Sequence, residues 1–173
     1  ITERHSFGAV VRRLEAAIGP PEKNAHVLPA TPKTPPAALL ISTNGVGMGH
    51  LTRALAIARR LQDPIRPVIV TMSQGAAVVN DFGFHVEFIP YHNYLGTDEA
   101  VWNAALRDEL IALIDAHGAR VVLLDGNSPF QGLLDALAER PHVWSIWSRR
   151  GMWRANAGQT FINREQYFDA VIE

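Results

Sequence analysis

The sequence contains no cysteine, which excludes a disulfide framework and any metal site built on thiolates. It has no apolar run that approaches the ~18 residues of a membrane-spanning helix. Basic side chains are not in excess, because 16 lysines and arginines stand beside 17 acidic residues, for a formal net charge of −1. We therefore expect neither a transmembrane segment nor a nucleic-acid-binding surface.

The chain also has no initiating methionine, because its first residue is Ile1. Its first residues do not show a signal-peptide pattern. We therefore expect it to be a piece of a longer chain, or a chain whose start was not recorded. Its 173 residues leave room for one ordinary domain with a full hydrophobic core.

Two segments precede the expected domain. Residues 1–19 predict an amphipathic helix, with Ser6 as its N-cap and Gly19 at its end. Residues 20–37 are rich in proline, as linkers often are. Two placements of the helix are open, because it either packs on the main domain or closes a preceding one. We favour the second placement, and the main domain then covers residues 38–173.

The most informative segment is residues 39–61, LLISTNGVGMGHLTRALAIARRL. A strand-length apolar run is followed by alternate glycines and then by apolar residues at helical spacing. Such a strand–turn–helix unit directs backbone N–H groups and the positive helix end toward an anion. It matches neither the dinucleotide fingerprint nor the triphosphate loop, because His50 takes the place of the third glycine and no lysine follows.

The remaining chain alternates between strand and helix patterns. Strands are predicted at residues 39–42, 67–72, 84–89, 120–125, 142–147 and 170–172, and helices at 51–61, 74–82, 99–117 and 129–139. Ser73 is the expected cap of the second helix, and Asn127 or Ser128 with Pro129 should open the last. We expect Phe88 and Ala105 to face the core. The fold class is α/β: a Rossmann-like, doubly wound parallel sheet in three αβα layers, with strand order 3-2-1-4-5-6.

In this strand order, a crevice opens between the loops after the first and fourth strands. These loops carry His50 and Asp125. A carboxylate bound to one imidazole nitrogen would fix the tautomer and leave the other nitrogen as a general base. The alternative is structural, since such a histidine often bonds only its own turn and such an aspartate is often only a cap. The glycine turn and the shared crevice favour the catalytic interpretation.

Other residues at this edge are candidates for substrate binding. Glycine at 47 and 49 would let a phosphate or sugar approach the backbone closely. Arg53 is placed to neutralise a diphosphate, and the arginines at 149 and 150 to bind an anionic acceptor or a partner domain. Solvated surface arginines are the alternative in each case. The full set of candidates is Gly47, Met48, Gly49, Arg53, Asn127, Arg149 and Arg150.

Residues 44–53, NGVGMGHLTR, resemble the amino-terminal glycine loop of GT-B glycosyltransferases. The resemblance is greatest to the branch that includes the peptidoglycan N-acetylglucosaminyl transferase and related nucleotide-sugar enzymes. It extends from about residue 38 to the end, and residues 147–153 and 168–173 also resemble bacterial members. The peptidoglycan enzyme has a proline soon after its histidine, whereas this chain has Leu51, Thr52 and Arg53 there. The particular acceptor of that enzyme is therefore not carried over.

The resemblance implies the acceptor-side domain of a glycosyltransferase of the hexosyltransferase type. The nucleotide sugar would be held chiefly by a carboxyl-terminal domain that this chain lacks, without metal or other cofactor. His50 would be the base and Asp125 its supporting acid. A nucleotide-sugar hydrolase or epimerase, and a non-catalytic Rossmann ligand-binding module, are the alternatives. We expect a cytoplasmic location, with the inner face of the membrane as a second placement, and a chain that folds alone without catalysing transfer.

Overall fold

The computed structural model describes residues 35–43, 48–149 and 162–173. The helix expected over residues 1–19, nearly all of the linker expected over residues 20–37, and the candidates Gly47 and Arg150 lie outside these ranges. No helix in the described ranges is long and apolar enough to cross a bilayer.

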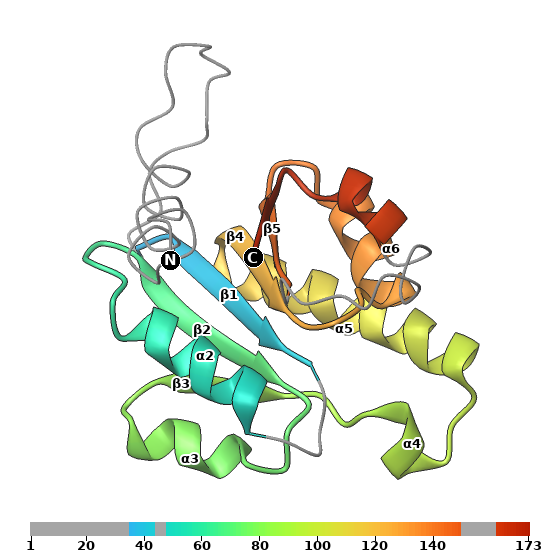
Figure 1. Cartoon of the computed structure of the whole chain (residues 1–173), viewed down its shortest axis with the longest axis horizontal. Coiled ribbons are helices and arrows are strands. Elements are labelled where there is room, and N and C mark those ends of the chain that lie inside the picture. The colour runs from blue at the N-terminus through green and yellow to red at the C-terminus, as the bar shows by residue number, and fades with distance from the viewer. Residues whose placement is uncertain (1–34, 44–47, 150–161) are drawn as a thin grey trace.

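The core of the domain is a six-stranded, all-parallel sheet (Figure 1). Its strands are β1 (Ala37–Ser42), β2 (Arg66–Thr71), β3 (His85–Phe88), β4 (Ala119–Asp125), β5 (Trp144–Ser148) and β6 (Ala170–Ile172). Their order is β3-β2-β1-β4-β5-β6, which confirms the predicted doubly wound topology.

Helices cover both faces of this sheet and complete three layers. They are α2 (Gly49–Ala58), α3 (Ala76–Asp81), α4 (His92–Leu95), α5 (Glu99–His117) and α6 (Gln131–Glu139), with a 3-10 turn, η2, at Asn163–Tyr167. In Figure 1, α2 and α3 lie in front of the sheet and α5 lies behind it. The αβα expectation is therefore confirmed.

Each central strand is buried on both faces, and the two-residue period of a strand decides which helices each side chain meets. In β4, Val121 and Leu123 belong to the cluster that contains α2, whereas Val122 and Leu124 belong to the cluster that contains α5 and α6. Continuing this alternation to the end of the strand places Asp125 on the α2 side. The same alternation places Ser42 of β1 and Thr71 of β2 on the α2 side.

Helix α5 follows its predicted limits closely. The Asp98 carboxylate caps it by accepting hydrogen bonds from the N–H groups of Ala100 and Val101. Gly118, with φ of 60°, ends it in the left-handed conformation. The apolar stripe that faces the sheet consists of Trp102, Leu106, Leu110, Leu113 and Ile114. Ala105 was expected in this stripe but is exposed, because it lies at the rim of a surface cleft beside the end of β3.

Three further sequence expectations were wrong. Ser73 does not cap α3, because its hydroxyl accepts instead from the N–H of Gly75, and the helix begins one residue later. Pro129 is not the first residue of α6, since Phe130 precedes the helix and packs its ring against Trp102, with 5.0 Å between centroids. Phe88 is 51% exposed, because it ends an edge strand that the helices do not cover there. Helix α4, in a segment expected to be a loop, was missed.

Helices α5 and α6 pack most closely at Gly132. A Cβ atom at this position would lie 2.2 Å from the backbone oxygen of Asn103. The Gly132 N–H donates to the Asn103 side-chain oxygen at 2.8 Å, so both backbone and side chain of α5 meet this glycine. The contact fixes the separation of the two helices on this face of the sheet.

Replacing Gly132 by alanine should therefore destabilise the fold, because the added methyl group must push the two helix backbones apart. We expect the free energy of unfolding to fall by about 1–3 kcal/mol, as overpacked sites typically do. Urea denaturation followed by circular dichroism measures this change. Gly49→Ala is the matched control, since nothing lies within 4 Å of a Cβ atom there, and its stability should be unchanged or slightly raised. Equal stability of the two variants would contradict the packing described here.

Candidate active site

The candidate site lies at the carboxyl edge of the sheet, where the neighbouring strands β1, β4 and β5 end. Asp125, the last residue of β4, pairs with Ser42 of β1 and with Ser148 of β5. Directly after β1, the Thr43 N–H donates to the backbone oxygen of Asp125 at 3.2 Å. The two loops that leave β1 and β4 are therefore tied together at their first residues, and the Asp125 backbone is fixed.

Gly126 makes this close approach possible. A Cβ atom on Gly126 would lie 2.3 Å from the Thr43 hydroxyl oxygen, so only glycine fits beside Thr43. The Gly126 carbonyl accepts a hydrogen bond from the indole N–H of Trp147 at 2.8 Å. Trp147 is completely buried, and it belongs to the core rather than to a sugar-stacking surface.

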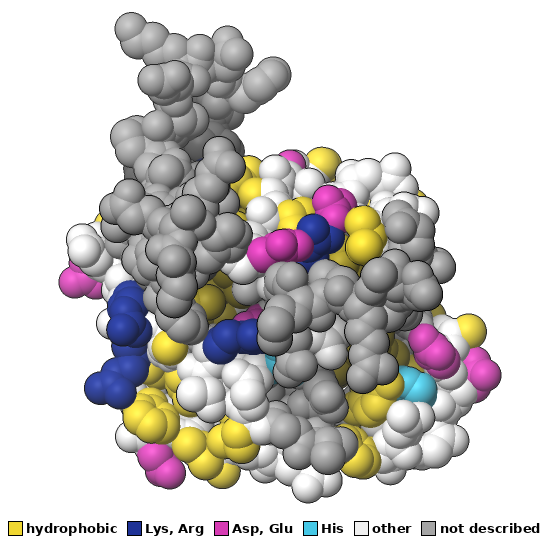
Figure 2. All heavy atoms as spheres, in the orientation of Figure 1, with side chains coloured by type: hydrophobic (Ala, Val, Ile, Leu, Met, Phe, Trp, Pro, Cys, Tyr) yellow, Lys and Arg dark blue, Asp and Glu magenta, His cyan; other side chains and the backbone are white. Residues whose placement is uncertain are grey.

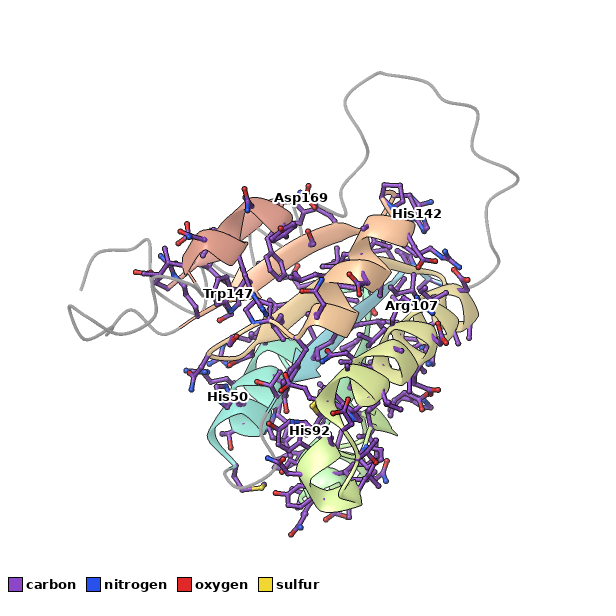
Figure 3. All side chains as sticks on the ribbon, turned by 90° about the vertical axis from the view of Figure 1, so that its right-hand side faces the viewer. His50, His92, Arg107, His142, Trp147 and Asp169 are labelled. Atoms are coloured by element: carbon purple, nitrogen blue, oxygen red, sulfur yellow. The ribbon has the colours of Figure 1, made fainter. Side chains whose placement is uncertain are left out.

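His50 and Asp125 are in direct contact, as the topology predicted. His50 is the second residue of α2, and its Nδ1 lies 2.6 Å from Oδ1 of Asp125. Asp125 is fully buried and His50 is only 5% exposed, so water does not compete for this hydrogen bond. In Figure 3, His50 and His92 lie toward one end of the sheet and His142 lies toward the other. The contact places the His50 imidazole at the carboxyl edge of the sheet, as expected. The catalytic role of His50 stays a prediction.

Arg53 is the third member of this group. It follows His50 by one helical turn, and its Nε and Nη2 donate to Oδ2 and Oδ1 of Asp125 at 2.7 and 2.5 Å. Two parallel hydrogen bonds of this kind are the strongest pairing of arginine with a carboxylate. We expected this guanidinium to face a diphosphate, and the structure instead gives it a buried partner within the fold.

The hydrogen-bonding capacities of these groups decide the tautomer of His50. A carboxylate paired with a guanidinium accepts hydrogen bonds and donates none, so Nδ1 of His50 must carry the proton that it shares with Asp125. Nη2 of Arg53 also lies 3.0 Å from Nδ1, because both nitrogens approach the same carboxylate oxygen. In the neutral ring, Nε2 then keeps its lone pair. Within the described ranges, no residue hydrogen-bonds to Nε2.

The first turn of α2 holds two other candidates. Gly49 begins the helix, and the space around its α-carbon is open on the side where a Cβ atom would point. Met48 is 44% exposed and lies with Phe82 and Val78 along a groove of about 660 Å³ between α2 and α3. Figure 2 shows basic side chains beside an apolar patch in this region. Substrate binding by these two residues stays a prediction.

The remaining described candidates, Asn127 and Arg149, follow β4 and β5. Asn127 is exposed in the loop after Asp125. Arg149 is engaged within the domain: its guanidinium pairs with Glu165 and with Glu173, and the second pair is 2.5 Å long. An anionic acceptor would have to compete with two carboxylates for Arg149. Its binding role stays a prediction.

Sequence reasoning missed a buried polar group between β1 and β2. The Ser42 and Thr71 hydroxyls lie 2.9 Å apart, and the Thr71 hydroxyl also accepts from the Ser73 N–H at 3.1 Å. These side chains join the two strand ends beside the glycine turn. A signal was present, because Ser42 and Thr71 are polar residues at the ends of apolar strands, just as Asp125 is.

Comparison with known proteins finds the same fold in several solved structures. No family model and no curated protein sequence matches the chain. A glycosyltransferase from Rickettsia africae shares 10% identity over 76% of this chain, with a TM-score of 0.59. MurG from Acinetobacter baumannii shares 15% identity over 79%, with a TM-score of 0.60. A UDP-GlcNAc 2-epimerase from Neisseria meningitidis, solved with UDP-GlcNAc, shares 10% identity over 76%, with a TM-score of 0.54.

The fold is that of one GT-B domain. This chain corresponds to 33%, 40% and 37% of those three solved chains, so it spans well under half of their length. Identities this low establish the GT-B fold, and the activities named for those proteins are their own. The expectation of a metal-free, cofactor-free reaction stays a prediction.

Arg53→Ala should lower the stability of the GT-B domain, because it leaves the fully buried Asp125 carboxylate without the guanidinium that neutralises its charge. We expect a loss of about 1.5–3 kcal/mol in the free energy of unfolding, the usual contribution of hydrogen bonds to a charged group. Arg59→Ala is the control, since Arg59 lies at the end of the same helix and contacts the Phe82 ring at the surface. It should change stability by less than about 0.5 kcal/mol. Indistinguishable denaturation curves for the two variants would refute the pairing.

In nitrogen-15 NMR of labelled histidine, the neutral form of the His50 ring should carry its proton on Nδ1 and none on Nε2, because Asp125 accepts from Nδ1. Asp125→Ala removes the acceptor and should redistribute the proton between the two nitrogens. His142 serves as the internal reference, since it is exposed at the other end of the sheet and should not change. A neutral His50 ring with its proton on Nε2 in the unmodified protein would contradict this assignment.

Proposed function

We propose that this chain is the acceptor-side domain of a GT-B glycosyltransferase, in which His50 is the general base. The supporting observation is the buried hydrogen bond of 2.6 Å between His50 Nδ1 and Asp125 Oδ1. It holds the ring in one tautomer at the carboxyl edge of a parallel sheet, where ligands of such folds bind. The GT-B neighbours that include glycosyltransferases add support at the level of the fold.

The proposed step is a displacement at the anomeric carbon of a nucleotide sugar. His50 Nε2 takes the proton of an acceptor hydroxyl as its oxygen forms the new glycosidic bond. The bond between the anomeric carbon and the diphosphate breaks, and the nucleoside diphosphate leaves with the electron pair. Asp125 stabilises the imidazolium that forms, as the acid does in a serine–histidine–aspartate triad.

Each protein group has a separate task in this step. Arg53 acts through Asp125, because its guanidinium fixes the carboxylate that orients the ring. The open backbone at Gly49 and the amino-terminal end of α2 are suited to developing negative charge on an acceptor or diphosphate. Donor binding is assigned to a second domain, since the chain spans only 33–40% of the solved proteins it matches.

A nucleotide-sugar epimerase or hydrolase is the second candidate. The specific observation in its favour is that a UDP-GlcNAc 2-epimerase shares the fold over 76% of this chain. In an epimerase His50 would remove a proton bound to sugar carbon, and in a hydrolase it would remove a proton from water. In a non-catalytic ligand-binding module, by contrast, His50 would only close the first turn of α2.

In the complete two-domain protein, we expect the kinetics to show that His50 and Asp125 act as one coupled unit. His50→Ala should lower kcat by ~10²–10⁴-fold, the usual contribution of a general base. Asp125→Asn should lower it by the same factor or less, because it disturbs the ring without removing it. The double variant should be no slower than His50→Ala alone. Losses that multiply in the double variant would show that the two residues act independently.

Product analysis separates the candidate reactions. The complete protein is incubated with nucleotide sugars, with and without acceptor alcohols, and products are resolved by mass spectrometry and proton NMR. Transfer predicts a glycoside that forms only with acceptor, together with free nucleoside diphosphate. An epimer of the donor, or free sugar without acceptor, would replace this proposal with the second candidate. No conversion with binding intact would favour the non-catalytic module.

A further inference from the structure

A second group of polar side chains lies at the outer strand of the sheet, beside the end of α5. His85 and Glu87 are alternate residues on the edge strand β3, and His117 is the last residue of α5. Val86, between them, packs against the cluster that contains α2, so His85 and Glu87 point to the opposite face of the sheet, and β3 lies three strands away from β4. This separates the group from the His50 site. Its chemistry is therefore independent of the proposed transfer reaction.

The three side chains converge on one point. Nε2 of His85 lies 2.6 Å, and Nε2 of His117 lies 3.0 Å, from the same oxygen of Glu87. One potential ligand atom from each residue lies within 4.8 Å of the other two. Within the described ranges this is the one group of three or more such residues placed closely enough to hold an ion. Two imidazoles and a carboxylate form a familiar set of zinc ligands.

From this geometry we infer that His85, Glu87 and His117 bind a divalent transition-metal ion of the zinc type. Ligand atoms around a tetrahedral zinc ion lie about 3.3 Å apart, given metal–ligand distances of about 2.0–2.1 Å. The Glu87 oxygen therefore needs to withdraw by about 0.7 Å from Nε2 of His85, at 2.6 Å, and by about 0.3 Å from Nε2 of His117, at 3.0 Å. Because the His85 side chain is 54% exposed and that of Glu87 31%, both have room to adjust. The fourth position is left for water.

The charges around His85, Glu87 and His117 affect how tightly they would bind a metal ion. Hydrogen bonding by His85 is the largest influence that holds the pKa of the Glu87 carboxyl below its usual value, with His117 acting in the same direction and burial against it. These hydrogen bonds are given up when the imidazole nitrogens bind an ion, and the carboxylate is the form of Glu87 that coordinates it. Arg66 acts against the metal, because its Nη1 lies 3.4 Å from Nδ1 of His117, on the side of the ring away from Glu87. We therefore expect micromolar rather than nanomolar binding.

The bound ion would add a link between the edge strand β3 and the end of α5, which the His117–Glu87 hydrogen bond already connects. Strand β3 is at the edge of the sheet and pairs with β2 alone. Coordination by His117 would tie this edge strand to the end of α5, at the point where that helix leads into β4. The site is thus a structural clamp, and metal binding should raise the thermal stability of the domain.

The test uses the purified chain, freed of any affinity tag and treated with chelator. Calorimetric titration with zinc chloride should show one site of micromolar affinity, and cobalt(II) should give the intense visible absorption of a four-coordinate ion. His85→Ala and Glu87→Gln should each weaken binding by about ten-fold or more. Both variants should fold, since His85 is exposed and glutamine keeps the shape of glutamate.

His142→Ala is the matched control, because this histidine is exposed, as His85 is, and is not one of the three ligands. Its zinc affinity should equal that of the parent. If His85→Ala binds zinc as tightly as the parent, the ion is held adventitiously elsewhere and the inference is wrong. Absence of micromolar zinc binding by the parent would equally overturn it. Neither outcome depends on glycosyl transfer, so the proposed function is tested separately.

Discussion

The candidate site depends on one buried carboxylate. Asp125 has no exposed surface, and its two oxygens are shared between a guanidinium and an imidazole. A carboxylate in such surroundings is costly unless it is fully paired, and Arg53 supplies the opposite charge. Because Arg53 and His50 are one turn apart on α2, the ion pair also fixes the rotation of that helix. The orientation of the imidazole is therefore a consequence of neutralising Asp125, and the same contact serves stability and the proposed chemistry.

The sheet explains why these groups meet. Parallel strands bring all their carboxyl ends to one edge, and β1 lies between β2 and β4 at the switch point. The register then aligns the last residues of β1, β4 and β5 in one row. Buried hydroxyls at Ser42 and Thr71 continue this polar row across β2. An otherwise apolar sheet thus acquires a polar edge where each strand stops.

The architecture and the His50–Asp125 contact could be predicted, because both depend on topology and on long periodic segments. Several local details could not. Helix starts at Ala76 and Gln131 were misplaced, since Ser73 and the Asn127–Pro129 segment fit the chemistry of a cap while tertiary packing chose other residues. The role of Arg53 was missed because sequence alone does not show whether an arginine faces a ligand or a buried carboxylate. His85, Glu87 and His117 gave no signal, since two of the three are separated from the third by a whole helix.

The strict alternation of side chains in β4 has a consequence for how this domain tolerates changes in length. Inserting or deleting one residue between Ala119 and Asp125 would turn the carboxylate to the α5 side of the sheet and exchange Leu123 and Leu124 between the two cores. Arg53 would then face an apolar strand end. The same insertion in the surface turn between α6 and β5 would move no strand residue across the sheet. We expect natural length variation among related chains to accumulate in such turns and to be absent from β4.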